Sequence, residues 1–352
     1  MCHSRLRRFF LLCCLVLSGL IAQASASQNS GTQVWFIPVP AGDMMKLAQQ
    51  PDAWPRARSR VDVFSLYFMN AYHHEGFVCG NACGPNTYPN LLNAVPEGMY
   101  RWLSDRFILA FEGTSIKPHA CTEDAIRNQA AFSTNIAISN IEDAGGRLTY
   151  ISLDEPFASG TATVQRNPFG AAYGGCSLSG EQVARLQRIF NDVVLAEHPS
   201  VQFGFIEPYP YFTPDEIIMH AMQLEDAGVR PAYFHLDFDV PRSVRERKNW
   251  IADVRRIRAF FAARAIPFGV IIVGGDGTSD QAYMTDAIAT MRAAYQAVGV
   301  TEHTILQSWA EDPPHDLMSL KHIPNTVPET QPGTHTWFIL EVLRYMGIAR
   351  TP

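Results

Sequence analysis

Apolar and polar positions divide the chain into two kinds of segment that alternate along its length. Short apolar stretches rich in β-branched and aromatic residues are typical of buried strands. Longer segments in which apolar residues recur at three- and four-residue spacing are typical of helices with one buried face. Strands are predicted at eight places: Gln33 to Val39, Val61 to Ala71, Arg106 to Gly113, Arg147 to Leu153, Val201 to Ile206, Pro231 to Phe238, Pro267 to Val273 and His303 to Ser308. Helices are predicted most clearly for Ser179 to Glu197, Pro214 to Ala227, Val244 to Ala265, Asp280 to Val298 and His335 to Ile348.

A strand followed by a helix, repeated eight times, predicts an α/β fold of the (β/α)8 barrel type. We expect one domain over residues 27–352, because barrels of this kind commonly exceed about 250 residues as a single unit. Ser179 and Gln182 have the spacing of a capping box, and Thr213 precedes a proline at the first helical position. Long connections follow strands two, three and four (residues 73–97, 114–124 and 157–178), which places the elaborated loops on the face where barrel enzymes bind substrate.

Acidic residues end five of the predicted strands. A charged group is costly inside an apolar core, and the C-terminal ends of parallel barrel strands meet at one face. Separate strands can therefore deliver acids to one cleft. The alternative for each acid is a cap on the following helix or a salt bridge within a loop. The residues concerned are Glu112, Asp154, Glu155, Glu207, Asp237, Asp239 and Asp276.

The first 26 residues have the layout of a secretory signal peptide. Three arginines precede an apolar stretch from Phe9 to Ile21, and a run of small residues with Ala-x-Ala cleavage sites follows. The apolar stretch is shorter than the roughly 20 residues that a membrane span needs. We therefore expect a secreted or periplasmic protein with no membrane association after cleavage.

Removing this segment takes away three of the 28 Lys and Arg residues and none of the 34 acidic ones, which leaves a formal charge of −9. Such an acidic chain offers no basic surface for nucleic acid or for an anionic membrane. Four cysteines remain, an even number in an exported chain, and this favours two disulfides over metal binding. The preferred pairs are Cys79 with Cys83 and Cys121 with Cys176, because they join near neighbours and adjacent loops.

The strongest chemical motif is Ile-Ser-Leu-Asp-Glu-Pro, from Ile151 to Pro156, at the end of the fourth predicted strand. There it resembles the Asn-Glu-Pro signature of the large superfamily of retaining glycoside hydrolases with an eightfold barrel. The resemblance implies that Glu155 is the general acid/base and that Asp154 stands where the superfamily has an asparagine that hydrogen-bonds the sugar. The substitution turns a neutral group into a charge. Two adjacent carboxylates repel each other, which should raise one pKa, as a general acid requires.

The position of the second catalytic carboxylate is open. The superfamily has a nucleophilic glutamate at the end of strand seven, where this chain has Gly274-Gly275-Asp276-Gly277. Asp276 can fill that role or cap a glycine turn. Glu207 is preferred, because strands four and five are neighbours in a barrel and Glu-Pro recurs in both. Asp237 and Asp239 stay open as alternatives, as do retaining and inverting stereochemistry.

Aromatic residues cluster near these acids, and sugars favour such surroundings because their apolar faces lie on aromatic rings while their hydroxyls need polar partners. Trp309 follows the eighth strand, where the resemblance implies a tryptophan under the sugar. Each aromatic can instead seal the barrel top, and His73 can be a loop hydrogen-bonding residue. The expected substrate-binding residues are Asp154, Glu112, Asp237, Asp239, Tyr209, Gln307, Trp309 and His73.

The sequence thus favours a secreted glycoside hydrolase that acts on a poly- or oligosaccharide with a pair of carboxylates and without a cofactor. Two alternatives stay open. His235, Asp237 and Asp239, with acids of neighbouring strands, form a pattern that fits the divalent-metal site of a sugar isomerase or lyase. A carbohydrate-binding barrel without activity is the other. The sequence indicates neither the sugar nor the oligomeric state.

Overall fold

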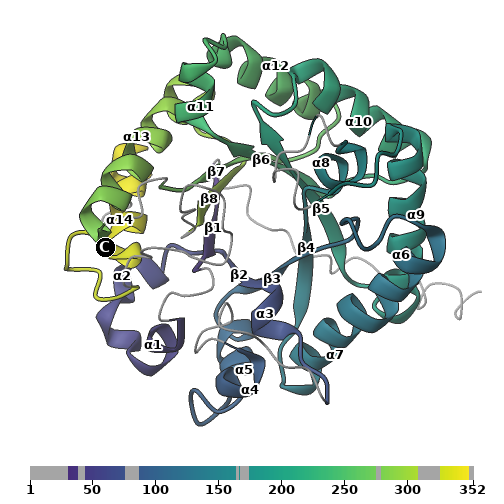
Figure 1. The fold of residues 1–352 in the computed structure, drawn as a ribbon. Helices are drawn as coiled ribbons and strands as arrows, with labels where there is room; N and C mark the ends of the chain where they lie inside the picture. Colours follow the sequence, from purple (N-terminus) through teal and green to yellow (C-terminus); the bar gives the residue numbers. More distant parts are fainter. Residues whose placement is uncertain are drawn as a thin grey trace, which may run out of the picture. The chain divides into compact units, whose positions relative to one another are not determined.

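The computed structural model describes residues 31–38, 44–75, 87–163, 166, 174–274, 279–307 and 326–348. From Thr32 onward the chain forms one compact unit, built on a closed barrel of eight parallel strands in the order β1 to β8, with β1 paired to β8 (Figure 1). The predicted (β/α)8 architecture is confirmed. The strands are β1 (Gln33–Ile37), β2 (Val63–Tyr67), β3 (Ile108–Gly113), β4 (Leu148–Asp154), β5 (Gln202–Tyr209), β6 (Tyr233–Phe238), β7 (Phe268–Ile272) and β8 (His303–Gln307).

Helices form a ring around the barrel (Figure 1). The capping box of Ser179 and Gln182 is present at the start of α9, and Thr213 caps α10 together with Glu216. The helical segments are α1 (Met44–Gln49), η1 (Pro51–Ala53), α2 (Pro55–Arg58), α3 (Phe68–Ala71), α4 (Tyr88–Leu91), α5 (Met99–Ser104), α6 (Glu123–Gln129), the π-helical η3 (Ala130–Thr134), α7 (Asn135–Asp143), α8 (Pro156–Thr161), α9 (Gly180–Glu197), α10 (Pro214–Asp226), α11 (Val240–Arg245), α12 (Trp250–Ala262), α13 (Asp280–Val298) and α14 (His335–Tyr345).

Two predicted elements differ from the structure: one strand ends earlier than predicted, and one helix is divided into two. The apolar stretch predicted as a strand from Val61 to Ala71 is β2 only as far as Tyr67, and the rest is α3, because the side chain of Asn70 accepts a hydrogen bond from the Tyr67 amide at 2.8 Å and caps the turn. The helix predicted from Val244 to Ala265 is divided into α11 and α12, with Arg247 between them in the left-handed region at φ 53°. Among the described residues, no helix combines the length and apolar character needed to cross a membrane.

The barrel interior is filled by aromatic rings. Trp35 is fully buried there, 4.9 Å from the ring of Tyr233 and 4.8 Å from that of His235. His235 Nε2 lies 3.0 Å from His303 Nδ1. Gly204 makes room for this packing, since a Cβ atom there would lie 1.9 Å from the Tyr233 ring. The interior below the strand ends is therefore a packed core, as in other barrels of this type.

Candidate functional site

Strand alternation determines which polar side chains face the mouth of the barrel, by which we mean the C-terminal ends of β1 to β8. Successive residues of a strand point to opposite faces, so residues two or four positions beyond an interior residue point inward as well. Ala110, Tyr150, Tyr233 and Ile305 belong to the interior cluster. The same face then carries Glu112 on β3, Asp154 on β4, Asp237 on β6 and Gln307 on β8. Gln307 Nε2 lies 3.4 Å from Glu112 Oε2, which confirms that strands three and eight converge there.

Glu155 follows β4 in a left-handed backbone conformation, with φ 49° and ψ 50°. This conformation is rare for a residue with a side chain and costs on the order of 1–3 kcal/mol. It is held by the Glu155 amide, which donates to Ile206 O at 3.0 Å, and by its carbonyl, which accepts from the Ser159 amide at 3.0 Å as α8 begins. The Glu155 side chain is only 7% exposed, and no described residue hydrogen-bonds to its carboxyl group.

Glu207 lies one residue beyond the interior residue Ile206 and therefore points away from the barrel axis. Its Oε1 accepts a hydrogen bond from the Phe157 amide at 2.8 Å, and its Oε2 accepts one from the Ala158 amide at 3.2 Å. These are amides of the first turn of α8, which would otherwise lack acceptors. Glu207, which is 2% exposed, thus binds the N-terminus of the helix that starts directly after Glu155.

Lys117 brings a positive charge to the same place. Its Nζ lies 2.8 Å from Asp154 Oδ2, and the two side chains are 15% and 34% exposed. Lys117 comes from the connection between β3 and α6, one of the three loops predicted to be long. Glu112, Asp154, Glu155, Glu207 and Asp237, with Lys117, interact electrostatically with one another. We refer to the five acids as the carboxylate cluster.

The three glutamates of the carboxylate cluster, Glu112, Glu155 and Glu207, favour the protonated form. Burial raises the pKa of Glu155 well above its ordinary value, and the negative charges of Asp154 and Asp237 raise it further, while Lys117 opposes them. Burial, Asp154 and Asp237 likewise raise the pKa of Glu112. Burial raises the pKa of Glu207 to about 8 even though two backbone amides lower it. A buried carboxylic acid that keeps its proton near neutral pH can act as a general acid.

Lys117 keeps its charge in this setting. Burial lowers its pKa, but the negative charges of Asp154, Glu155 and Glu207 outweigh burial, so its pKa lies above the ordinary value. The site therefore pairs buried acids with a fixed cation. This combination can donate a proton and hold a polar ligand.

Three predicted substrate-binding residues contact partners that do not belong to the carboxylate cluster. The Tyr209 hydroxyl donates to Asp253 Oδ2 at 2.6 Å, on the α12 side of the barrel. Asp239 is exposed and its side chain accepts from the Arg242 amide at 2.7 Å, so it caps α11. The His73 ring stacks on Tyr88 at the start of α4, with ring centroids 6.1 Å apart. For Asp239, the helix cap is the alternative that the sequence left open.

Asp276 and Trp309 lie outside the described residues, as do the first 30 residues and Cys79 and Cys83. The hypothesis of a metal site loses one of its ligands, because His235 is buried in the barrel interior against His303 instead of reaching the mouth of the barrel. Within the described ranges, no group of three or more His, Cys, Asp and Glu side chains is arranged to hold a metal ion.

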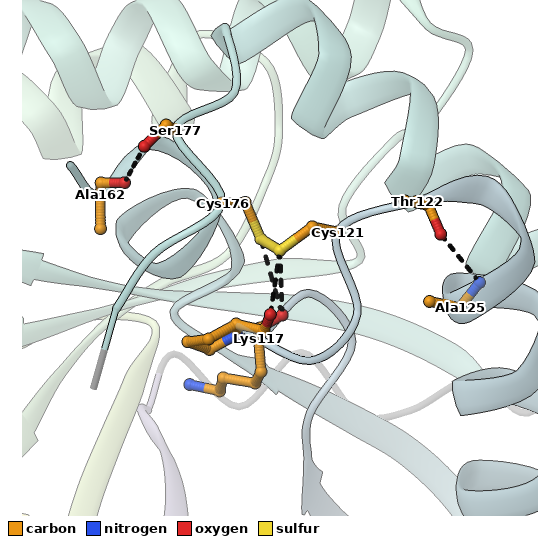
Figure 2. Close-up of a disulfide and its surroundings, with 8 residues drawn as sticks. Lys117, Cys121, Thr122, Ala125, Ala162, Cys176 and Ser177 are labelled. Carbon is orange, nitrogen blue, oxygen red and sulfur yellow. Dashed lines mark hydrogen bonds between the residues drawn. A yellow bond between two sulfur atoms is a disulfide. The ribbon is translucent and has the colours of Figure 1, made fainter. Parts of the chain in front are cut away.

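The predicted disulfide between Cys121 and Cys176 is present, with Cα atoms 5.4 Å apart. It joins the β3–α6 connection, which carries Lys117, to the segment that precedes α9 (Figure 2). Sequence reasoning missed Lys117 itself. The available signal was a lysine four residues before a loop cysteine, in a loop that follows a strand ending in an acid.

No protein-family model matches the sequence, and no curated protein matches it. Solved structures do. The GH53 catalytic domain of Ignisphaera aggregans aligns with a TM-score of 0.51 at 13% identity, over 80% of this chain and 87% of that one. A GH5_18 protein from Streptomyces cattleya, in complex with GlcNAc, aligns with a TM-score of 0.53 at 12% identity, over 92% of this chain and 82% of that one. A variant of the same protein with bound Manb1-4GlcNAc aligns equally well, with a TM-score of 0.53 at 12% identity, over 92% of this chain and 83% of that one.

At these identities the similarity concerns the fold. This chain closes the same kind of eight-stranded parallel barrel as these TIM-barrel glycoside hydrolases, in agreement with the resemblance seen in the sequence.

Proposed function

We propose that this protein is an exported glycoside hydrolase in which Glu155 is the general acid/base. The observation that carries the proposal is the Glu155 carboxyl group itself. It is buried at the mouth of the barrel in a costly backbone conformation, and no described residue hydrogen-bonds to it. Because no described residue hydrogen-bonds to this carboxyl group, it is available to a ligand that binds at the mouth of the barrel. Its raised pKa supplies the proton that a leaving glycosidic oxygen needs.

For the second carboxylate, the contacts of Glu207 support a positioning role. Both of its oxygens already accept backbone hydrogen bonds from α8, and it points away from the barrel axis. Asp237 faces the interior on β6 and interacts electrostatically with Glu155, so it stays a candidate beside Glu207 and Asp276. A nucleophile or base has to reach the anomeric carbon or its attacking water, and inward-facing Asp237 suits this better than Glu207 does.

The test is hydrolysis of a panel of poly- and oligosaccharides, followed by chromatography of the products. Because structures of similar fold hold GlcNAc and Manb1-4GlcNAc, N-acetylglucosaminides and mannosides belong in the panel. Glu155→Gln should lose at least about a hundredfold in kcat/KM on whichever substrate is cleaved. Glu197→Gln is the matched control, because Glu197 is exposed at the end of α9, where the chain turns toward the start of β5. Full activity of Glu155→Gln would remove Glu155 from the mechanism.

The second carboxylate is identified in the same assay. Asp237→Gly, Asp276→Gly and Glu207→Ala are compared with and without sodium azide. In a retaining enzyme, azide that enters the space left by the nucleophile attacks the anomeric carbon directly, so turnover returns with inverted configuration in the glycosyl azide and that product identifies the nucleophile. Activity of the unmodified protein is also measured after dialysis against EDTA. We expect no loss, and a loss restored by one added divalent metal would support the metal-dependent alternative.

A further inference from the structure

Both ends of Lys117 make contacts: its backbone carbonyl oxygen accepts a hydrogen bond, and its ammonium group forms an ion pair with Asp154. The carbonyl accepts the Ala120 amide at 2.7 Å, and the preceding residue, Ile116, is fully buried. Both sulfur atoms of the Cys121–Cys176 disulfide lie 3.6 Å from the same carbonyl oxygen (Figure 2). Disulfide sulfurs carry no proton to donate, so these are packing contacts that fix the loop. The backbone of Lys117 is therefore held against the disulfide while its side chain extends to Asp154.

The other half of the disulfide is fixed to α8. The Cys176 amide donates to Ser159 O at 3.3 Å, and the amides of Ser177 and Leu178 donate to Ala162 O at 3.0 Å and Gly160 O at 2.9 Å. These acceptors belong to α8 and its C-terminal cap, and α8 starts directly after Glu155. The disulfide thus joins the loop that carries the ammonium group to the helix that follows the proposed acid.

We propose that Lys117 is a positioning residue for the adjacent pair Asp154 and Glu155, and that the Cys121–Cys176 disulfide fixes the loop from which its ammonium group reaches Asp154. The inference rests on the proposed function, in which Glu155 is the general acid. Lys117 acts on Glu155 through its charge and on Asp154 through a direct ion pair. It is assigned no contact with the reacting atoms.

The direction of the effect follows from the charges around Glu155. Lys117 lowers the pKa of Glu155, whereas burial, Asp154, Asp237 and Glu207 raise it. A general acid works only while protonated, so activity falls as the pH rises through its pKa. Removing the cation should therefore move the alkaline limb of the pH profile to higher pH. Groups that act on Glu155 or on Lys117 from the surrounding elements are Glu112, Asp154, Glu207, Tyr211 and Asp237.

The experiment measures kcat/KM against pH for the unmodified protein, Lys117→Met, Lys117→Arg and the double variant Cys121→Ser with Cys176→Ser. In Lys117→Met we expect the alkaline limb to move up by about one pH unit, the lower end of the range for one nearby opposite charge. Lys117→Arg should restore most of the original profile. The double serine variant should shift the limb in the same direction by a smaller amount, because the ammonium group is present but less fixed. Lys248→Met is the control, since Lys248 pairs with Glu246 on the surface.

A second measurement does not depend on activity. The pKa of Glu155 is read from its carboxyl ¹³C resonance in protein labelled at glutamate, with Glu155→Gln identifying the signal. If this pKa is unchanged in Lys117→Met, the inference is wrong even where turnover has fallen. If the pKa rises as expected but Glu155→Gln hydrolyses substrate normally, the proposed function fails and the electrostatic coupling stands. Thermal unfolding of each variant shows whether it is still folded, so that a change in the pH profile can be assigned to the lost charge and not to unfolding.

Discussion

Glu155 combines an unfavourable left-handed backbone conformation with the carboxyl group that we propose as the general acid. A left-handed conformation costs a residue with a Cβ atom about 1–2 kcal/mol, while glycine adopts it freely. The position after β4 and before Pro156 is therefore one where the best residue for stability is not the residue present. Such local conflicts are typical of functional positions.

This conflict gives a testable prediction. Glu155→Gly and Glu155→Ala both remove the carboxyl group, and both should be inactive. Glu155→Gly should nevertheless be more stable than Glu155→Ala by about 1 kcal/mol in the free energy of unfolding, because only glycine relieves the strain. It should therefore unfold at a higher urea concentration. Urea unfolding followed by circular dichroism measures the difference. Equal stability of the two variants would mean that the left-handed backbone at residue 155 is not strained.

At the level of secondary structure, α8 is held at its start by a carboxyl group from another strand. A six-residue helix has little stability of its own, so the contacts of Glu207 with the Phe157 and Ala158 amides contribute much of what fixes it. Because α8 packs against both α9 and β5, a shift of its first turn would also displace Glu155.

If Glu207 is a positioning residue, its conservative and its truncating variants should differ. Glu207→Gln keeps a carbonyl acceptor and should retain a measurable part of kcat. Glu207→Ala leaves two buried amides without acceptors and should cost about 2–6 kcal/mol of stability, since each unsatisfied group costs about 1–3 kcal/mol. Activity and urea midpoints of both variants are compared. Complete loss of activity in Glu207→Gln at unchanged stability would instead support a role as nucleophile or base.

The sequence predicted most elements correctly where one physical signal dominates. Strand period, helix period and the Ser179 capping box are local signals, and the eight strands and α9 follow from them. It was wrong at the end of β2, where the cap formed by Asn70 turns an apolar stretch into a short helix. The same limit applies to the site. The prediction for Glu155 came from its neighbours in the sequence, whereas nothing in the sequence indicates that the Tyr209 hydroxyl meets Asp253 of α12.

For the whole molecule, two sets of buried groups favour opposite pH ranges. Burial raises the pKa of Glu207 to about 8, so its folded form keeps a proton that the unfolded chain has lost. Its contribution to stability is present below the ordinary value of 4.5 and is lost as the pH rises to about 8. Burial lowers the pKa of His303 to about 4. Its contribution is present above the ordinary value of 6.5 and is lost as the pH falls toward about 4.

The free energy of unfolding should therefore be highest between the two ordinary values, 4.5 and 6.5, where the two contributions change in opposite directions. It should fall on both sides of this range, by about 1.4 kcal/mol for each unit of pKa difference that is titrated. Each of two single variants should reduce the pH dependence of the free energy of unfolding on one side of this range. Glu207→Gln should reduce the alkaline decline, and His303→Gln should reduce the acidic decline. Urea midpoints measured across the pH range decide this. An alkaline slope that stays the same in Glu207→Gln would show that Glu207 ionises at its ordinary value.

The aromatic filling of the barrel interior also limits how a long molecule can travel through the protein. Trp35, Tyr233 and His303 close the central axis, with Tyr233 lying directly over the bare backbone of Gly204. A polymer bound at the strand ends consequently cannot thread the barrel and has to cross it laterally, entering and leaving on the same side.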